Sequence, residues 1–554
     1  MKNLCKSALG LSLAIAMIFS LAMFAGAADN SLKVFVAADI HYRPYSELTP
    51  LKDIKSQIDD PLYLHANDKS MLTYEADAVV AAFLADVAAS GAKVLLIPGD
   101  LSEEGHWAEH LGIAKILKDF QKRSGVKVFV IPGNHDIRTS ASRGRLDLED
   151  FLDLYADLGY NRALARREGD ASYTAELGNG YRLLAIDAIV YRQDESAVSP
   201  ELFTWIEEQL AQAKKDGKKL IAMTHYNVLD HLLVEGFTGG LLTIDQYRKM
   251  ATMLADGGVK YVFTGHMHAN DITFADTAKG NRIFDVQTGC LLAYPNAYRQ
   301  VTFSDKEVKI ETRYVTKINT ALLPKGFSKA QLDLMKSDFP KYSYDYHRAA
   351  FRSYSDMLPD LTGTLADALG AEKGTVGYEI IDMMVRSLTL AVKMPLYGEK
   401  NSVEALAKKA GVKLEPSEYR NLLDLAGVIY AGHYAGNEQY PMESLEMKLL
   451  GQAVNAVLVT AMVPEIGPLP GLAARRIYAR TPGKAFTNEF VRMLAAGILT
   501  DWGPPDDLNA TLEPYGEKWD MSGAVKITDF TFAIDVTARV FRMGFNTMLR
   551  MVGL

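Results

Sequence analysis

Short apolar runs alternate with amphipathic stretches from residue 32 to about residue 305. Each run is rich in Val, Ile, Leu or Phe and is closed by a polar residue, as buried strands are. The stretches between them, such as residues 75–90 and 203–217, repeat apolar residues at helical spacing. The pattern predicts an α/β domain over residues 28–315. The runs are LKVFVAAD (32–39), AKVLLIPGD (92–100), VKVFVIPGNHD (126–136), YRLLAIDA (181–188), KKLIAMTH (218–225) and VKYVFTGHMH (259–268).

The pattern changes beyond about residue 315, where long stretches with helical spacing replace the short runs. Examples are residues 378–394, 444–463 and 486–499. We therefore expect residues 316–554 to form a mainly α-helical C-terminal region. The uncharged run 449–463 is shorter than a membrane span requires and is followed by Pro464, which favours a buried helix.

The N-terminus has the pattern of an export signal. Lys2 and Lys6 precede an uncharged apolar run, and Ala25 and Ala27 have the spacing of an A-x-A cleavage site. We expect residues 1–27 to be a signal peptide and the rest of the chain to be extracytoplasmic: secreted, periplasmic or on the cell surface. Because the apolar run is long enough nearly to cross a bilayer, an uncleaved N-terminal anchor is the alternative.

Charge and cysteine content narrow the class further. The formal net charge of −8 makes a poor surface for a nucleic-acid duplex, so no such partner is expected. The two cysteines are Cys5 and Cys290, and Cys5 lies in the segment expected to be removed. The mature chain then has no internal disulfide, which suits a bacterial envelope protein better than a small disulfide-rich secreted one.

Residue types that bind metals close five of the six apolar runs. Ligands gather beyond the carboxyl ends of strands in α/β folds, because the loops diverge there while the strands stay in register. A pair of close metal ions needs a carboxylate that can bridge, with imidazoles and an amide oxygen for the remaining positions. The run ends supply these types: Asp39, His41, Asp100, Asn134, His135, His225, His266 and His268.

The ordered motifs DIH, GD, GNHD, a single His and GHMH resemble those of the calcineurin-like metallophosphoesterase superfamily. The resemblance covers residues 32–305 and implies a two-sheet α/β/β/α sandwich. It implies that Asp39, His41 and His268 hold one divalent metal ion. By the same motifs, Asn134, His225 and His266 hold a second, Asp100 bridges the two, and His135 is the general acid, with Asp136 fixing its orientation.

Mixed carboxylate, imidazole and amide ligands without a thiolate suit Mn, Fe or Zn. Purple acid phosphatases resemble this pattern but have D-x-G first and a Tyr three residues after the Asp of their GD motif. This chain has His41 and Glu103 at those positions, so an iron-tyrosinate site is not expected. The leading D-x-H and the GNHD motif are similar to those of phosphodiesterases of the class III cyclic nucleotide group, which favours a diester substrate slightly.

Three other features have structural interpretations. His106, Glu109 and His110 spell H-x-x-E-H, a metalloprotease-like pattern, but no third ligand accompanies them. We expect them to be helix residues over or near the pocket. Asp187 is expected to be a structural loop acid, and Cys290 a buried thiol.

The sequence thus predicts an exported dinuclear phosphoesterase that hydrolyses a phosphodiester or a phosphomonoester with a metal-activated water. One alternative is a binding or scaffold protein that keeps the fold without turnover, although the ligand set is complete. Another gives residues 316–554 the task of docking to membrane or cell wall, with the basic apolar segment 532–554 as a candidate surface helix. A simpler alternative is that this region covers one wall of the catalytic domain and shapes its pocket.

Overall fold

The computed structural model describes the predicted α/β domain almost completely and the helical region in part. The predicted signal segment and residues 486–499 and 532–554 lie outside the described residues, so the expectations for them stay predictions. The described residues are 31–55, 62–66, 70–137, 144–189, 198–231, 246–351, 389–410, 412–436, 444–453, 456, 509–512 and short pieces between 362 and 386.

One sheet begins with the first apolar run. Its strand order is β13-β12-β11-β1-β2-β3, with β1 to β3 parallel and the other neighbours antiparallel. The strands β1 and β2 are buried almost throughout, as expected of central strands covered on both faces. The bounds are β1 (Leu32–Val36), β2 (Val94–Pro98), β3 (Lys127–Ile131), β11 (Ala297–Phe303), β12 (Val308–Tyr314) and β13 (Asn509–Leu512).

The second sheet has the order β4-β5-β6-β7-β8-β10-β9. Its centre, β6-β7-β8-β10, is parallel, and antiparallel pairs complete both edges. The bounds are β4 (Ala163–Arg166), β5 (Tyr173–Gly178), β6 (Tyr181–Ala185), β7 (Lys219–Met223), β8 (Tyr261–Thr264), β9 (Asp271–Asp276) and β10 (Arg282–Gln287). All six apolar runs therefore contain strands, three in each sheet.

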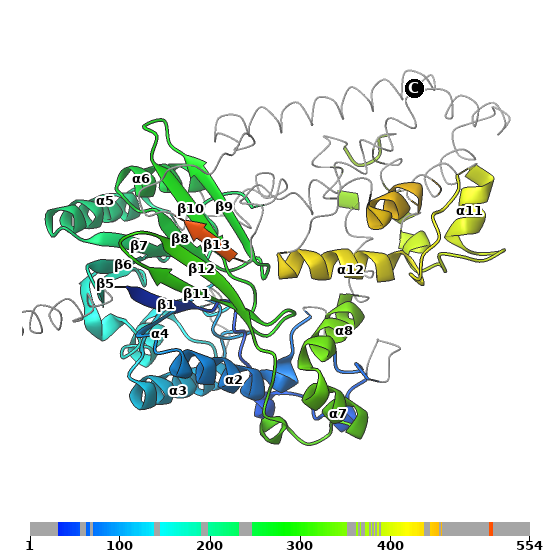
Figure 1. Cartoon of the computed structure of the whole chain (residues 1–554), viewed down its shortest axis with the longest axis horizontal. Helices are drawn as coiled ribbons and strands as arrows, with labels where there is room; N and C mark the ends of the chain where they lie inside the picture. The colour runs from blue at the N-terminus through cyan, green and yellow to red at the C-terminus, as the bar shows by residue number, and fades with distance from the viewer. Residues whose placement is uncertain are drawn as a thin grey trace, which may run out of the picture.

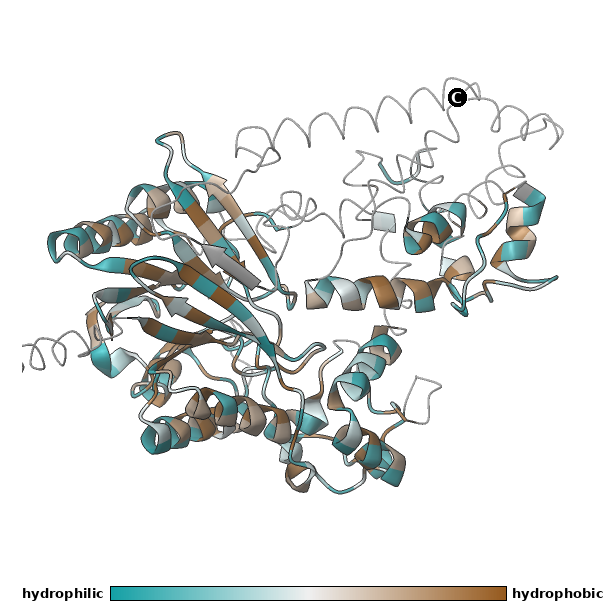
Figure 2. Cartoon of the chain, in the orientation of Figure 1, coloured by the Kyte–Doolittle hydropathy of each residue, from teal (hydrophilic) through white to brown (hydrophobic). Residues whose placement is uncertain are grey.

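Helices cover the outer faces of the two sheets, which confirms the predicted α/β/β/α sandwich (Figure 1). On one side are α2 (Ala76–Ala89) and α3 (Trp107–Ser124), and on the other are α5 (Pro200–Lys215) and α6 (Tyr247–Asp256). The short α4 (Leu148–Leu154) lies near α3. Figure 2 shows hydrophilic and hydrophobic residues interleaved along α3 and α5, as amphipathic surface helices require.

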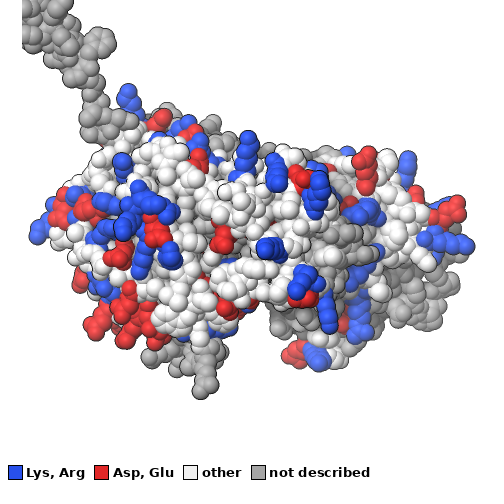
Figure 3. Space-filling view, turned by 90° about the horizontal axis from the view of Figure 1, so that it is seen from below, with Lys and Arg blue, Asp and Glu red and all other residues white. Residues whose placement is uncertain are grey.

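The described part of the C-terminal region is mainly helical, as predicted. Its described helices are α7 (Lys329–Ser337), α8 (Phe339–Phe351), α11 (Val403–Ala410) and α12 (Leu422–Ala435), and residues 445–453 are also helical. Within the described residues, no helix combines the length and the apolar character needed to cross a membrane. On the face seen in Figure 3, acidic and basic side chains are intermixed.

The packing core does not stop at residue 315. Met335 of α7, Tyr342 and Tyr346 of α8, and Tyr434 of α12 belong to the same hydrophobic cluster as the first sheet. The other half of α12 packs into a separate cluster with α11. The proposed domain boundary between residues 315 and 316 stays a prediction, but α7, α8 and the end of α12 are attached to the sandwich.

Candidate metal centre

The strand ends that carry ligand-type residues meet at one edge of the sandwich. Asp39 and His41 follow β1, Asp100 follows β2, Asn134 follows β3, His225 follows β7, and His266 and His268 follow β8. Five of these residues have positive φ, a conformation that costs a non-glycine residue about 1 kcal/mol or more and that gathers at functional sites. They are Asp39 (51°), His41 (46°), Asp100 (50°), His266 (72°) and His268 (61°).

The motif glycines allow the loops to approach one another. A Cβ on Gly265 would lie 2.5 Å from Oδ2 of Asp39, and a Cβ on Gly133 would overlap the carboxylate of Asp100. The glycines of GHMH and GNHD, Gly265 and Gly133, are therefore required by close packing against ligand-type side chains. A larger residue at either position would push Asp39 or Asp100 away from the other ligand-type side chains.

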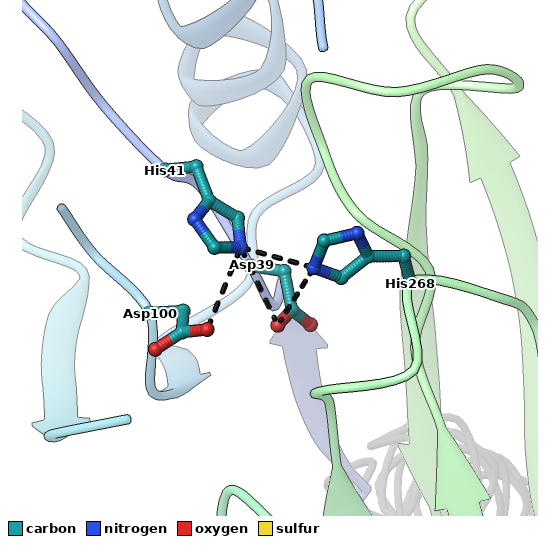
Figure 4. A group of neighbouring side chains, drawn as sticks. All are labelled: Asp39, His41, Asp100 and His268. Carbon is teal, nitrogen blue, oxygen red and sulfur yellow. Dashed lines mark hydrogen bonds and ion pairs between the residues drawn. The ribbon is translucent and has the colours of Figure 1, made fainter. Parts of the chain in front are cut away.

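One group of side chains converges around Nε2 of His41 (Figure 4). This atom lies 3.0 Å from Nε2 of His268, 3.5 Å from Oδ2 of Asp100 and 4.0 Å from Oδ1 of Asp39. Nε2 of His268 is also 3.7 Å from Oδ1 of Asp39. These four residues have ligand atoms close enough together to hold one metal ion. They are the three predicted ligands of the first metal and the predicted bridge.

A second group forms on the other side of Asp100. Nε2 of His225 lies 3.3 Å from Oδ2 of Asp100 and 2.9 Å from Oδ1 of Asn134. The ring of His266 is 5.1 Å from the ring of His225, centroid to centroid. The structure thus places all seven predicted ligands at one edge of the sandwich: four of them have ligand atoms within 4.8 Å of one another, and Asn134, His225 and His266 lie beside these four.

The carboxylate of Asp100 lies between the two groups. Its Oδ1 accepts a hydrogen bond from the backbone N–H of His135 at 2.8 Å. Its Oδ2 is buried, makes no hydrogen bond with the part of the chain that is described, and faces Nε2 of both His41 and His225. A buried carboxylate oxygen aimed between two sets of imidazoles fits a bridging ligand, so the donor set suits a pair of divalent cations.

Hydrogen-bond acceptors fix the orientation of two of these imidazoles. Nδ1 of His41 lies 2.8 Å from Oε2 of Glu103, and Nδ1 of His225 lies 2.9 Å from the carbonyl oxygen of Pro98. With Nδ1 engaged in this way, the Nε2 atom of each ring is directed at the centre. Outer partners of this kind raise the basicity of a ligating His and hold its tautomer.

Crowded charges shift the pKa values at the centre in opposite directions. Burial raises the pKa of Asp39 to about 7. Burial alone would also raise the pKa of Asp100, but His225 and His41 hold it well below its usual range. At His225, burial would lower the pKa, but the neighbouring Asp100 raises it to about 9. At His268, burial and the neighbouring His41 both hold the pKa well below its usual range. A shared cation would stabilise the carboxylates and the neutral imidazoles together.

The predicted catalytic pair is only partly arranged as expected. The ring of His135 lies 4.7 Å from the ring of His41, and its Nδ1 is 2.6 Å from the carbonyl oxygen of Glu103. Burial lowers the pKa of His135, against the raising effect of Asp100. The orientation of this ring thus comes from Glu103.

Asp136 does not make the contact with His135 that was predicted for it. Its fully buried carboxylate accepts hydrogen bonds from the backbone N–H groups of Gly133, Leu101 and Ser102 and from the Ser102 hydroxyl, at 2.8 to 3.1 Å. A carboxylate saturated by these donors joins the GD loop to the GNHD loop. The contacts support a structural role rather than the predicted one.

The H-x-x-E-H pattern also has a structural explanation. Oε2 of Glu109 accepts hydrogen bonds from the backbone N–H groups of Glu104 and His106 at the start of α3. His110 is buried, with Nδ1 2.8 Å from the Tyr155 hydroxyl and Nε2 3.0 Å from the carbonyl oxygen of Asp136. His110 therefore lies under the GNHD loop, which is near the centre and not over it.

The remaining two expectations are confirmed. Asp187 accepts hydrogen bonds from the backbone N–H groups of Ala171 and Ile189 at 2.8 and 3.1 Å, as a structural loop acid does. Cys290 is a buried thiol whose Sγ donates to the carbonyl oxygen of Asp39 at 3.0 Å. Burial raises the pKa of this thiol well above its usual range, which disfavours the thiolate that a nucleophile requires.

Sequence reasoning missed three residues around the centre. Glu103 could have been found, because it lies three residues after Asp100 in the same loop. Asn270 and Tyr434 contact each other beside His268, but they are 164 residues apart in the chain. No local pattern connects such a pair.

Comparisons with known proteins agree with this description. Residues 32–270 match the family model of the calcineurin-like phosphoesterases. This part of the chain is therefore a calcineurin-like phosphoesterase domain, and the match, with the gathered Asp and His side chains, supports a metal-dependent phosphoesterase with a dinuclear divalent metal centre. No curated protein matches the chain.

Distantly similar solved structures include a dimetal phosphatase from Danio rerio, with 12% identity, TM-score 0.38, and coverage of 52% of this chain and 98% of that one. A purple acid phosphatase from yellow lupin has 13% identity and TM-score 0.34, and the match covers 51% of this chain and 52% of that one. A putative 5'-nucleotidase from Staphylococcus aureus has 14% identity and TM-score 0.34, and the match covers 55% of this chain and 58% of that one.

Proposed function

We propose that the protein is an exported, dinuclear metal-dependent phosphoesterase that hydrolyses a phosphodiester or a phosphomonoester outside the cytoplasm. The observation that carries the proposal is the position of Oδ2 of Asp100 between His41 and His225, at 3.5 and 3.3 Å. One buried carboxylate oxygen shared by two groups of ligands is the arrangement that a two-metal site needs. The N-terminal sequence pattern supports export.

The predicted ligands divide into two sets that share Asp100. Asp39, His41 and His268 would hold one ion, and Asn134, His225 and His266 would hold the other. Bound ions of this kind supply a nucleophilic water at neutral pH and stabilise charge on the phosphoryl oxygens. Mn, Fe and Zn all suit these carboxylate, imidazole and amide donors.

His135 is positioned to give a proton to the leaving oxygen. Its Nδ1 donates to the carbonyl oxygen of Glu103, which leaves Nε2 as the atom that transfers the proton. Burial lowers the pKa of this imidazole, but the negative charge of a bound phosphate would raise it again. A bound phosphate would thus favour the protonated form of His135 that donates the proton.

The test is the initial rate of residues 28–554, loaded with Mn²⁺, on bis(p-nitrophenyl) phosphate and on p-nitrophenyl phosphate. We expect faster turnover of the diester. Asn134→Ala should abolish turnover by removing a ligand, and His135→Ala should reduce it by about 100-fold or more.

The control for His135→Ala is Mn²⁺ binding, which that variant should retain because His135 is not a predicted ligand. Faster monoester turnover would redirect the search to phosphatase substrates. If the wild type binds two ions and hydrolyses neither ester, the scaffold alternative replaces the catalytic one. Fractionation of the producing cells tests export separately, and an exclusively cytoplasmic product would contradict it.

A further inference from the structure

The helical region contacts the metal centre through the last turn of α12. The backbone carbonyl of Tyr434 accepts hydrogen bonds from both the backbone N–H and the side-chain Nδ2 of Asn270, each at 3.2 Å. The last carbonyls of a helix have no partner within the helix, so they are free to bind an outside donor. Asn270 lies two residues after His268, in the loop that follows β8.

Asn270 is the point where this loop is fixed to its surroundings. Its side chain is fully buried, and its Oδ1 accepts from the backbone N–H of Gly289 at 3.2 Å. The loop is held further where the carbonyl of His268 accepts from Cys290 and the carbonyl of Ala269 accepts from Gln287, at 3.1 and 2.9 Å. The α12 contact is the one in this set that comes from outside the sandwich.

The ring of Tyr434 also lies against the predicted ligand itself. Its centroid is 6.3 Å from that of His268, with the planes at 83°, an edge-to-face arrangement. The Tyr434 side chain is held in turn, because its hydroxyl accepts from the Tyr430 hydroxyl at 2.8 Å and its ring packs 4.7 Å from that of His347. His268 thus has the rigid Tyr434 ring on one side and His41 on another.

Two hydrophobic clusters hold α12 in place. Tyr434 belongs to the cluster of the first sheet, and Leu422, Leu425 and Ile429 belong to the separate cluster around α11. Figure 1 shows α12 running from the α11 side to the loops at the edge of the sheets. The helix therefore connects the outlying helical cluster to the loop that carries two predicted ligands.

We propose that Tyr434 and Asn270 are positioning residues of the metal centre, so that α12 completes the site from outside the family domain. The pair holds the loop of residues 265–270 such that Nε2 of His268 faces Asp39 and His41. This inference rests on the proposed function, because it assumes that His268 binds a metal ion. By this inference, α12 of the helical region supports a metal ligand of the catalytic domain.

Binding of Mn²⁺ alone to the full chain, followed by isothermal titration calorimetry, tests the inference. Tyr434→Ala removes the ring beside His268, and Asn270→Ala removes the side-chain hydrogen bonds to Tyr434 and Gly289. We expect each substitution to weaken the binding of one of the two Mn²⁺ ions by about tenfold, as loss of outer-shell support typically does. Tyr434→Phe keeps the ring and the backbone carbonyl, so it should bind both ions like the wild type. If Tyr434→Ala fails to fold, Tyr434→Leu replaces it, because it keeps the apolar bulk but not the ring.

Leu425→Ala is the matched control. Leu425 is fully buried in the same helix but lies in the outlying cluster, so its truncation lowers stability without touching the loop. Equal loss of Mn²⁺ affinity in Leu425→Ala and Tyr434→Ala, or full affinity in Tyr434→Ala and Asn270→Ala, would overturn the inference. A wild type that binds no Mn²⁺ would instead contradict the proposed function, so the two failures are distinguishable.

Discussion

At the scale of single residues, Glu103 serves two histidines with two different groups. Its carboxylate lies 2.8 Å from Nδ1 of His41, and its backbone carbonyl lies 2.6 Å from Nδ1 of His135. One residue thereby orients both a predicted ligand and the predicted general acid. A side-chain substitution removes only the first of these contacts, which makes the two functions separable.

Glu103→Ala should weaken Mn²⁺ binding by about 10- to 100-fold, because His41 loses the acceptor that holds its tautomer. Glu103→Gln keeps an acceptor at the same place and should retain most of the affinity. Titration calorimetry with Mn²⁺ measures both effects.

Glu104→Ala is the control for that comparison, since the neighbouring Glu104 is paired with Arg145 at 3.4 Å, away from the centre. Wild-type affinity in Glu103→Ala would show that the carboxylate does not support His41.

At the scale of elements, α8 and α12 pack through aromatic rings around His347. This imidazole is fully buried, stacks on Tyr430 at 5.3 Å, and finds no hydrogen-bond partner for either nitrogen among the residues that the structure describes. Burial, with a smaller effect of His433, lowers its pKa to about 3. The folded protein thus holds His347 neutral where an unfolded chain would protonate it.

The free energy of unfolding should therefore fall as pH falls below about 6.5, the ordinary pKa of His. A group whose folded pKa is depressed stabilises the fold above its unfolded pKa and loses that contribution toward its folded pKa of about 3. His347 alone contributes a slope of up to about 1.4 kcal/mol per pH unit in this range.

His347→Phe, which keeps a ring beside Tyr430, should remove that slope. Urea unfolding of the wild type and the variant at pH 7, 6 and 5 measures the difference. Parallel losses of stability in the two proteins would exclude His347 as the cause.

At the scale of the whole molecule, the metal centre joins the two sheets of the sandwich. Asp39, Asp100 and Asn134 follow strands of the first sheet, whereas His225, His266 and His268 follow strands of the second. Each predicted metal ion would therefore be bound from both sheets at once. Metal binding and the packing of one sheet on the other should be coupled.

Removal of metal with EDTA should lower the melting temperature by several degrees. A ligand at 100 times its dissociation constant stabilises the folded state by about 2.7 kcal/mol. Differential scanning fluorimetry with Mn²⁺ and with EDTA measures the shift, and Asp100→Asn, which weakens the bridge, should reduce it. An identical melting temperature in both buffers would contradict a metal site between the sheets.

The sequence predicted the sandwich, and it predicted which ligand-type side chains lie together at one edge of it, because both are encoded locally. Apolar runs ending in Asp39, Asp100 or His225 mark strand and ligand together, and parallel strands bring their ends to one edge. The surroundings of the ligands were not predictable in this way. The contact of Tyr434 with Asn270 depends on tertiary packing, and Asp136 looked catalytic because its hydrogen bonds to the GD loop leave no trace in the motif.

The pairing of β13 with β12 has a consequence for any shortened form of this chain. The chain leaves the first sheet after β12 and returns at residues 509–512 to cover its edge. A protein that ends before residue 509 would expose the unpaired N–H and C=O groups of Val308 to Glu311, and open strand edges recruit strands from other molecules. We expect such a truncation to self-associate, and monodisperse light scattering at high concentration would contradict this. With β13 in place, a four-residue edge strand stands where the seven-residue β12 would otherwise form the edge, and short edge strands are less able to pair with other molecules.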